Sequence, residues 1–155
     1  MGKTKIASKV AKMSNKSRIL IVDDDEVVRW SYLRSLESIS RNVEAASDGE
    51  QALQTMAQNP FDVVLLDLRM PGQDGLSVLH TIKQKWPESE VVIITGYPTV
   101  DSAKEAVRLG AHDYVAKPVG PQEVINVADS ARRRKQWALR RVSEDSDATT
   151  GACAA

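Results

Sequence analysis

The chain has 155 residues, 42% of them hydrophobic, and its 21 basic side chains are balanced by 21 acidic ones. This length suits one domain with tails, and the zero net charge excludes binding to nucleic acid or acidic substrates through overall charge. One cysteine excludes an intrachain disulfide, and the lack of a long apolar run or a signal peptide predicts a cytoplasmic protein without membrane segments.

Residues 1–17 are polar and basic and are predicted to form a flexible tail. Beyond them, short apolar runs of strand length alternate with segments whose apolar residues recur at helical spacing. Taken in chain order, the predicted strand and helix units are 18–22 with 27–39, 42–47 with 49–58, 61–66 with 76–85, 91–94 with 100–109, and 112–116 with 121–141.

Several of these strands are apolar throughout, which indicates that helices cover both of their faces. Five strand and helix units with short connections therefore predict an α/β fold, a doubly wound parallel sheet with right-handed crossovers. Sheets of this kind place their functional sites at the C-terminal ends of the strands.

Polar residues collect at these strand ends. Asp23 and Asp24 follow the first strand, Asp67 the third, Thr95 the fourth and Lys117 the fifth. Three carboxylates that lie close together repel one another, and a hard cation such as Mg²⁺ relieves this repulsion through oxygen ligands. One carboxylate is then free to act as a nucleophile toward a phosphoryl group, with the lysine and the threonine binding its oxygens.

Each of these residues taken alone has an ordinary structural explanation. An aspartate after a strand commonly forms a turn or caps a helix, and a threonine in a strand follows from strand propensity. A lysine before a proline is commonly a solvated surface charge. The agreement of all five in order and position favours a shared phosphoryl site.

Four stretches together resemble the receiver domain of bacterial two-component response regulators, especially receivers of the NtrC type. They are 19–24, 63–75, 92–96 and 110–118, and the resemblance covers roughly residues 18–131. It implies a flavodoxin-like (βα)5 fold with strand order 2-1-3-4-5. It also implies that the protein is a phosphorylation-activated switch and not an enzyme, apart from its own phosphorylation and slow autodephosphorylation.

The resemblance implies roles for the residues at the strand ends. Asp67 resembles the phosphoacceptor, and Lys117 and Thr95 would bind the phosphoryl group. Asp24, Asp67 and the backbone carbonyl of Arg69 resemble the Mg²⁺ ligands, with Asp23 acting on the metal mainly through water.

Thr95 and Tyr114 resemble a switch pair that remodels the face made by the fourth helix, the fifth strand and the fifth helix. This face is also where the resemblance implies a homodimer. The Lys117-Pro118 peptide bond is expected to be cis.

Two further positions border the expected phosphoryl site. Arg69 lies two residues after Asp67, and Tyr97 lies two residues after Thr95. Their bulk is expected to shield the phosphoryl group from water, so we predict slow autodephosphorylation.

The C-terminal part is predicted to consist of a basic extension of the last helix, 132–141, and a disordered tail, 142–155. The basic run suits a solvated helix end, a linker to an output domain or a docking surface. No helix-turn-helix follows it, so only indirect action on DNA is expected. Trp30, Trp86 and Trp137 are predicted to anchor the core or its rim.

Three functions are compatible with these residues. The first is a response regulator that takes a phosphoryl group from a sensor histidine kinase and passes the signal to an unknown output protein or domain. The second is the N-terminal receiver part of an NtrC-type transcription factor. The third, an aspartate-based phosphatase, would need a second aspartate at position 69, where the chain has arginine.

Overall fold

The computed structural model describes the backbone of residues 16–152 and the side chains of residues 16–142. Most of the predicted basic tail, 1–15, and Cys153 therefore lie outside the described residues. All five predicted strand and helix units are confirmed. In chain order they are β1 Ser17–Val22, α2 Glu26–Leu36, β2 Arg41–Ala46, α3 Gly49–Gln58, β3 Val63–Leu66, α4 Gly75–Lys85, β4 Glu90–Thr95, α5 Val100–Arg108, β5 Asp113–Ala116 and α6 Pro121–Ala152.

The five strands form one parallel sheet in the order β2-β1-β3-β4-β5, which is the predicted order. The strand order reverses between β1 and β3, so this pair marks the topological switch point. Just past the ends of these two strands, the Asp67 amide donates a hydrogen bond of 2.9 Å to the carbonyl of Val22. The residues that follow the strands consequently meet at one edge.

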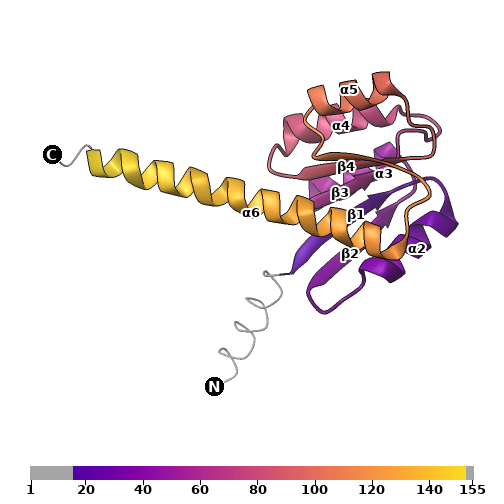
Figure 1. Cartoon of the computed structure of the whole chain (residues 1–155), viewed down its shortest axis with the longest axis horizontal. Helices are drawn as coiled ribbons and strands as arrows, with labels where there is room; N and C mark the ends of the chain where they lie inside the picture. The colour runs from indigo at the N-terminus through magenta and orange to yellow at the C-terminus, as the bar shows by residue number, and fades with distance from the viewer. Residues whose placement is uncertain (1–15, 153–155) are drawn as a thin grey trace.

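Helices cover both faces of the sheet, as the apolar strands predict (Figure 1). Alternate residues of each strand point to opposite faces, which gives two hydrophobic clusters. One cluster joins the sheet to α3, α4 and α5, and the other joins it to α2 and α6. Both faces of the sheet are therefore packed against helices. Among the described residues, no helix is both long enough and apolar enough to cross a membrane.

The predicted end of the last helix at Arg141 is wrong, because α6 continues to Ala152. Residues 142–152, predicted as a disordered tail, belong to this helix. Serine, aspartate and threonine each lower helix propensity by only tenths of a kcal/mol, and extending an existing helix needs no new nucleation. The chain has no proline after Pro121, so nothing interrupts the helix.

Two of the three tryptophans do not anchor the core. Trp30 is 59% exposed and Trp137 is 58% exposed, whereas Trp86 is partly buried and packs against the core cluster beside α4. Each exposed tryptophan lies beneath an arginine four residues later, with 4.8 Å from the guanidinium carbon to the ring centroid. Such stacking covers part of an exposed ring without burying it.

Candidate functional site

Three carboxylates meet where β1 and β3 end. Oxygen atoms of Asp23, Asp24 and Asp67 all lie within 4.8 Å of one another. Asp23 and Asp67 are only 2% and 6% exposed, whereas Asp24 opens to solvent. The sheet order therefore assembles the acidic cluster expected from residues 44 positions apart.

Lys117 reaches this cluster from the end of β5. Its ammonium nitrogen lies 2.6 Å from Oδ2 of Asp23 and 3.4 Å from Oδ2 of Asp67. Burial alone would lower the pKa of Lys117, but the hydrogen bond and charge of Asp23 raise it above the usual lysine value. The side chain is therefore a permanent positive charge beside the two buried carboxylates.

The two buried carboxylates are held differently. Both carboxylate oxygens of Asp23 are hydrogen-bonded. Oδ1 accepts a hydrogen bond of 2.9 Å from the amide of Asp25, and Oδ2 accepts one from the ammonium group of Lys117. Asp67 has only two long contacts of 3.4 Å, from the amide of Arg69 and from Lys117. Of the two, Asp67 is the carboxylate whose oxygens are available for a reaction.

Burial raises the pKa of Asp67, and the nearby charge of Asp23 raises it further. Lys117 opposes both effects but does not overcome them. Burial likewise raises the pKa of the Tyr32 phenol on α2, with Lys117 acting in the opposite direction. The site therefore disfavours the charged forms of Asp67 and Tyr32, and a cation bound beside Asp67 would counter this effect.

The donor set fits Mg²⁺. Three carboxylates supply the hard oxygen ligands that this ion prefers, and exposed Asp24 leaves a side open for the waters that Mg²⁺ retains. Lys117 compensates only part of the repulsion among the three carboxylates, and a second cation would offset the rest. No zinc-like ligand set competes here, because the cluster contains neither histidine nor cysteine.

Thr95 and Tyr114 lie on neighbouring strands, with Thr95 at the end of β4 and fully buried. The Thr95 hydroxyl accepts a hydrogen bond of 3.1 Å from the amide of Tyr97. The Tyr114 hydroxyl lies 2.6 Å from the hydroxyl of Ser102. It also accepts a hydrogen bond of 3.3 Å from the amide of Thr99. The tyrosine thereby ties β5 to the first turn of α5.

Arg69 and Tyr97 come together above the loops that carry them. The guanidinium carbon of Arg69 lies 4.1 Å from the centroid of the Tyr97 ring. Both side chains are exposed, and the tyrosine is 61% exposed. The stack joins the loop after β3 to the loop after β4, next to the two strand ends that carry Asp67 and Thr95.

Sequence reasoning missed three supports of the site. The Arg29 side chain on α2 donates a hydrogen bond of 2.7 Å to the backbone carbonyl of Asp23. The Ser102 hydroxyl is hydrogen-bonded to the hydroxyl of Tyr114. A side chain at Gly75 would place its Cβ 2.6 Å from the carbonyl oxygen of Asp67. Only the glycine had a sequence signal, since a glycine opening a helix after a strand suggests close backbone approach. The expected cis peptide between Lys117 and Pro118 is present.

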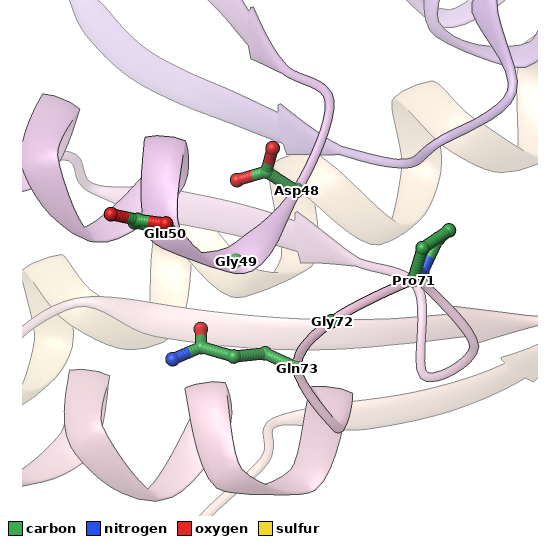
Figure 2. A pocket seen from close by; sticks show the side chains of 6 residues that line it. All are labelled: Asp48, Gly49, Glu50, Pro71, Gly72 and Gln73. Carbon is green, nitrogen blue, oxygen red and sulfur yellow. The ribbon is translucent and has the colours of Figure 1, made fainter.

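A separate hollow of about 390 Å³ lies between the loop into α3 and the loop into α4. Asp48 and Glu50 border it on one side, and Pro71 and Gln73 on the other (Figure 2). The carboxylate cluster does not line it. The hollow is therefore separate from the carboxylate cluster.

Comparison with known proteins agrees with this geometry. The profile of the response regulator receiver domain matches residues 19–129. The DNA-binding transcriptional regulator NtrC of Escherichia coli K12 is 36% identical over 113 residues, which are 73% of this chain and 24% of that protein. The chain thus spans about a quarter of the length of the curated relatives it matches.

Solved structures show the same fold. A CheY-like receiver domain protein from Methanospirillum hungatei JF-1 has a TM-score of 0.76 at 26% identity, covering 79% of this chain and 98% of that one. NtrX from Brucella abortus, solved in complex with ADP, has a TM-score of 0.75 at 32% identity, covering 83% of this chain and 29% of that one. The receiver-domain match to residues 19–129 includes the carboxylate cluster and strands β2 to β5, together with all of β1 except Ser17 and Arg18.

Proposed function

This chain belongs to the receiver-domain family of two-component response regulators, and on that premise we propose that Asp67 accepts a phosphoryl group from the phosphohistidine of a sensor kinase. The observation that carries this assignment is the contrast between the two buried carboxylates. Asp23 has short contacts to both oxygens, whereas Asp67 has only long ones. Transfer of a labelled phosphoryl group from a phosphorylated kinase domain to this chain tests the proposal, which fails if the chain never acquires label that alkali and hydroxylamine release.

In the proposed step, a carboxylate oxygen of Asp67 attacks phosphorus as the bond from phosphorus to the imidazole nitrogen breaks. The imidazole leaves with the bonding electron pair, and an acyl phosphate forms on Asp67. Lys117 lies 3.4 Å from Asp67, close enough to bind an oxygen of the transferred group. The Thr95 hydroxyl would donate a hydrogen bond to another phosphoryl oxygen, once its present hydrogen bond from the amide of Tyr97 is broken.

Mg²⁺ is the proposed cofactor, held by Asp24, Asp67 and the backbone carbonyl of Arg69, with Asp23 acting through water. The bound ion would offset negative charge during phosphoryl transfer. The close approach of the three carboxylates supports this assignment.

Asp24→Asn is expected to weaken Mg²⁺ binding by about tenfold or more, as loss of a direct ligand should cost at least as much as loss of an outer-shell partner. Titration calorimetry with Mg²⁺ measures the change. Because Asp24 is exposed, thermal stability without the metal should stay nearly constant. The exposed acid Asp101 on α5 gives a control: unchanged affinity in Asp24→Asn, or an equal loss in Asp101→Asn, would remove Asp24 from the metal site.

The stack of Arg69 on Tyr97 is proposed to slow autodephosphorylation by keeping water from the line of attack. We expect the double variant Arg69→Ala, Tyr97→Ala to lose its phosphoryl group about tenfold faster, which corresponds to about 1.4 kcal/mol in the barrier. The loss of labelled phosphate over time measures this rate. Arg34→Ala breaks a similar stack on α2 and should leave the rate unchanged; equal rates in both variants would refute the shielding role.

Phosphorylation is proposed to change partner binding through Thr95 and Tyr114. The face involved comprises α5, β5 and α6, and Val100 and Val107 of α5 are about 70% exposed there. Such apolar side chains suit a homodimer or an output partner. Because the tyrosine hydroxyl is bonded to Ser102, any movement of Tyr114 must release or shift the start of α5.

The coverage of the relatives supports a second proposal, that this receiver acts as the N-terminal part of an NtrC-type transcription factor. DNA would then be contacted through another domain. A phosphatase is disfavoured, because position 69 carries an arginine stacked on Tyr97 in place of a second acid. Catalytic hydrolysis of a phosphate monoester by this chain would support the phosphatase function instead. We also propose a cytoplasmic location, because the chain would have to meet the phosphorylated domain of its sensor kinase there.

A further inference from the structure

Asp24 is the least secured carboxylate of the acidic cluster. One of its oxygens lies within 4.8 Å of oxygens of Asp23 and Asp67, yet the residue is exposed. Within the described residues its carboxylate has no hydrogen bond or ion pair. Asp23, in contrast, is held through both oxygens by the amide of Asp25 and by Lys117. The place of Asp24 in the cluster therefore depends on the backbone that carries it.

Helix α2 anchors the backbone on both sides of Asp24. After it, the Asp25 side chain caps the helix by accepting hydrogen bonds of 2.9 Å and 3.4 Å from two amides of the first turn. Before it, the backbone carbonyl of Asp23 lies past the end of β1 and accepts a hydrogen bond of 2.7 Å from Nη1 of Arg29. No other described group donates to this carbonyl. Arg29 thus fixes the peptide unit that joins Asp23 to Asp24.

Arg29 acts on this backbone and not directly on Asp67. The residue is half-buried, and within the described part of the chain its guanidinium forms no salt bridge with a carboxylate. The charges that act most strongly on the pKa of Asp67 are those of Asp23 and Lys117. A guanidinium bonded to a carbonyl makes a charge-assisted hydrogen bond, which is stronger than a neutral one. The bond from Arg29 is therefore suited to holding the loop between β1 and α2.

We propose that Arg29 is a positioning residue for the metal site. By holding the Asp23 carbonyl it keeps the next residue, Asp24, close to Asp67, so that both carboxylates can bind one Mg²⁺. This inference rests on the proposed function, which makes Asp24 and Asp67 metal ligands. Mg²⁺ demands nearly ideal octahedral geometry, so a small displacement of an exposed ligand weakens its binding. Groups that orient a metal ligand typically contribute about tenfold to hundredfold in metal affinity.

The direction of the effect separates positioning from simple electrostatics. Arg29 carries a positive charge near the site of a divalent cation, and like charges repel. Loss of this charge alone should therefore leave Mg²⁺ binding unchanged or make it tighter. Loss of a positioning hydrogen bond should make Mg²⁺ binding weaker. A weaker affinity after neutralisation of Arg29 consequently cannot arise from the lost charge.

Titration calorimetry of the full chain with Mg²⁺, without a phosphodonor, measures this affinity. Arg29→Gln removes the charge and shortens the side chain, while glutamine keeps a strong helix propensity for α2. We expect the affinity of Arg29→Gln for Mg²⁺ to fall about tenfold. Arg29→Lys keeps the charge and a donor and should recover part of this loss. Arg34→Gln removes the same charge from an exposed position of α2 and should bind Mg²⁺ as the unmodified chain does.

A double-mutant cycle shows whether Arg29 acts through Asp24. In the Asp24→Asn background, Arg29→Gln should weaken Mg²⁺ binding by less than about twofold, because the ligand that Arg29 positions is already impaired. An effect exerted elsewhere in the molecule would give the same loss in both backgrounds. Circular dichroism and thermal unfolding in metal-free buffer check that each variant is folded.

Three results would overturn the proposal. They are unchanged or tighter Mg²⁺ binding by Arg29→Gln, equal losses in Arg29→Gln and Arg34→Gln, and a full loss that persists in the Asp24→Asn background. None of them bears on the phosphorylation of Asp67, because the calorimetry uses no phosphodonor. Absence of Mg²⁺ binding by the unmodified chain would contradict the metal assignment itself and would overturn the role of Arg29 with it.

Discussion

We expect the Asp67→Asn variant to acquire no phosphoryl group from a small phosphodonor or from a phosphorylated kinase. An amide lacks the negatively charged oxygen that attacks phosphorus, and Asp23, the other buried carboxylate, is held by Asp25 and Lys117. Phosphate-binding gel electrophoresis measures the phosphorylated fraction. Asp113→Asn, which alters an exposed acid at the start of β5, should retain normal uptake.

Asp67→Asn should nevertheless fold at least as stably as the unmodified chain when Mg²⁺ is absent. Burial raises the pKa of Asp67, so its charged form costs stability above the folded pKa, and this cost disappears as the pH falls below the unfolded value. Removing the charge therefore stabilises the apo protein at neutral pH. A melting temperature well below that of the unmodified chain would mean that lost uptake reflects unfolding and not lost chemistry.

The second large effect is expected at Gly75, where α4 begins. A Cβ atom there would lie 2.5 Å from Cα of Leu68 and 2.6 Å from the carbonyl oxygen of Asp67. Both atoms belong to backbone, which cannot rotate away as a flexible side chain would. We expect Gly75→Ala to cost about 3 kcal/mol and to lower the melting temperature by about 10 °C.

Because the clash lies on the backbone of Asp67 and Leu68, phosphoryl uptake by Gly75→Ala should fall even at temperatures where the variant is folded. Gly120→Ala is the control, since nothing lies within 4 Å of its added methyl group. Differential scanning calorimetry of both variants measures the difference. Equal melting temperatures would contradict the close packing of α4 against the loop after β3.

The fold was predictable because its signals are local and repeated. Continuous apolar strands such as 63–66 and 91–94 require helices on both faces, and the polar residues after them mark one edge of the sheet. The order of Asp23, Asp67, Thr95 and Lys117 along the chain then placed the candidate site. These inferences need only the direction of each strand.

Features that depend on side-chain packing could not be predicted in the same way. Nothing in the sequence distinguishes the fully engaged Asp23 from the loosely held Asp67, because both follow apolar strands. The bond from Tyr114 to Ser102 joins two elements whose facing side chains are known only once the sheet is formed. The length of α6 was missed because polar residues weaken a helix without ending it.

The measurement that tests the central claim most directly is the location of the phosphoryl group. The phosphorylated chain is reduced with borohydride, which converts an aspartyl phosphate into homoserine, and the peptides are sequenced by mass spectrometry. We predict homoserine at position 67 and at no other acid. Homoserine at Asp23 or Asp24, or a phosphoryl group retained on a histidine with Asp67 unmodified, would contradict the account.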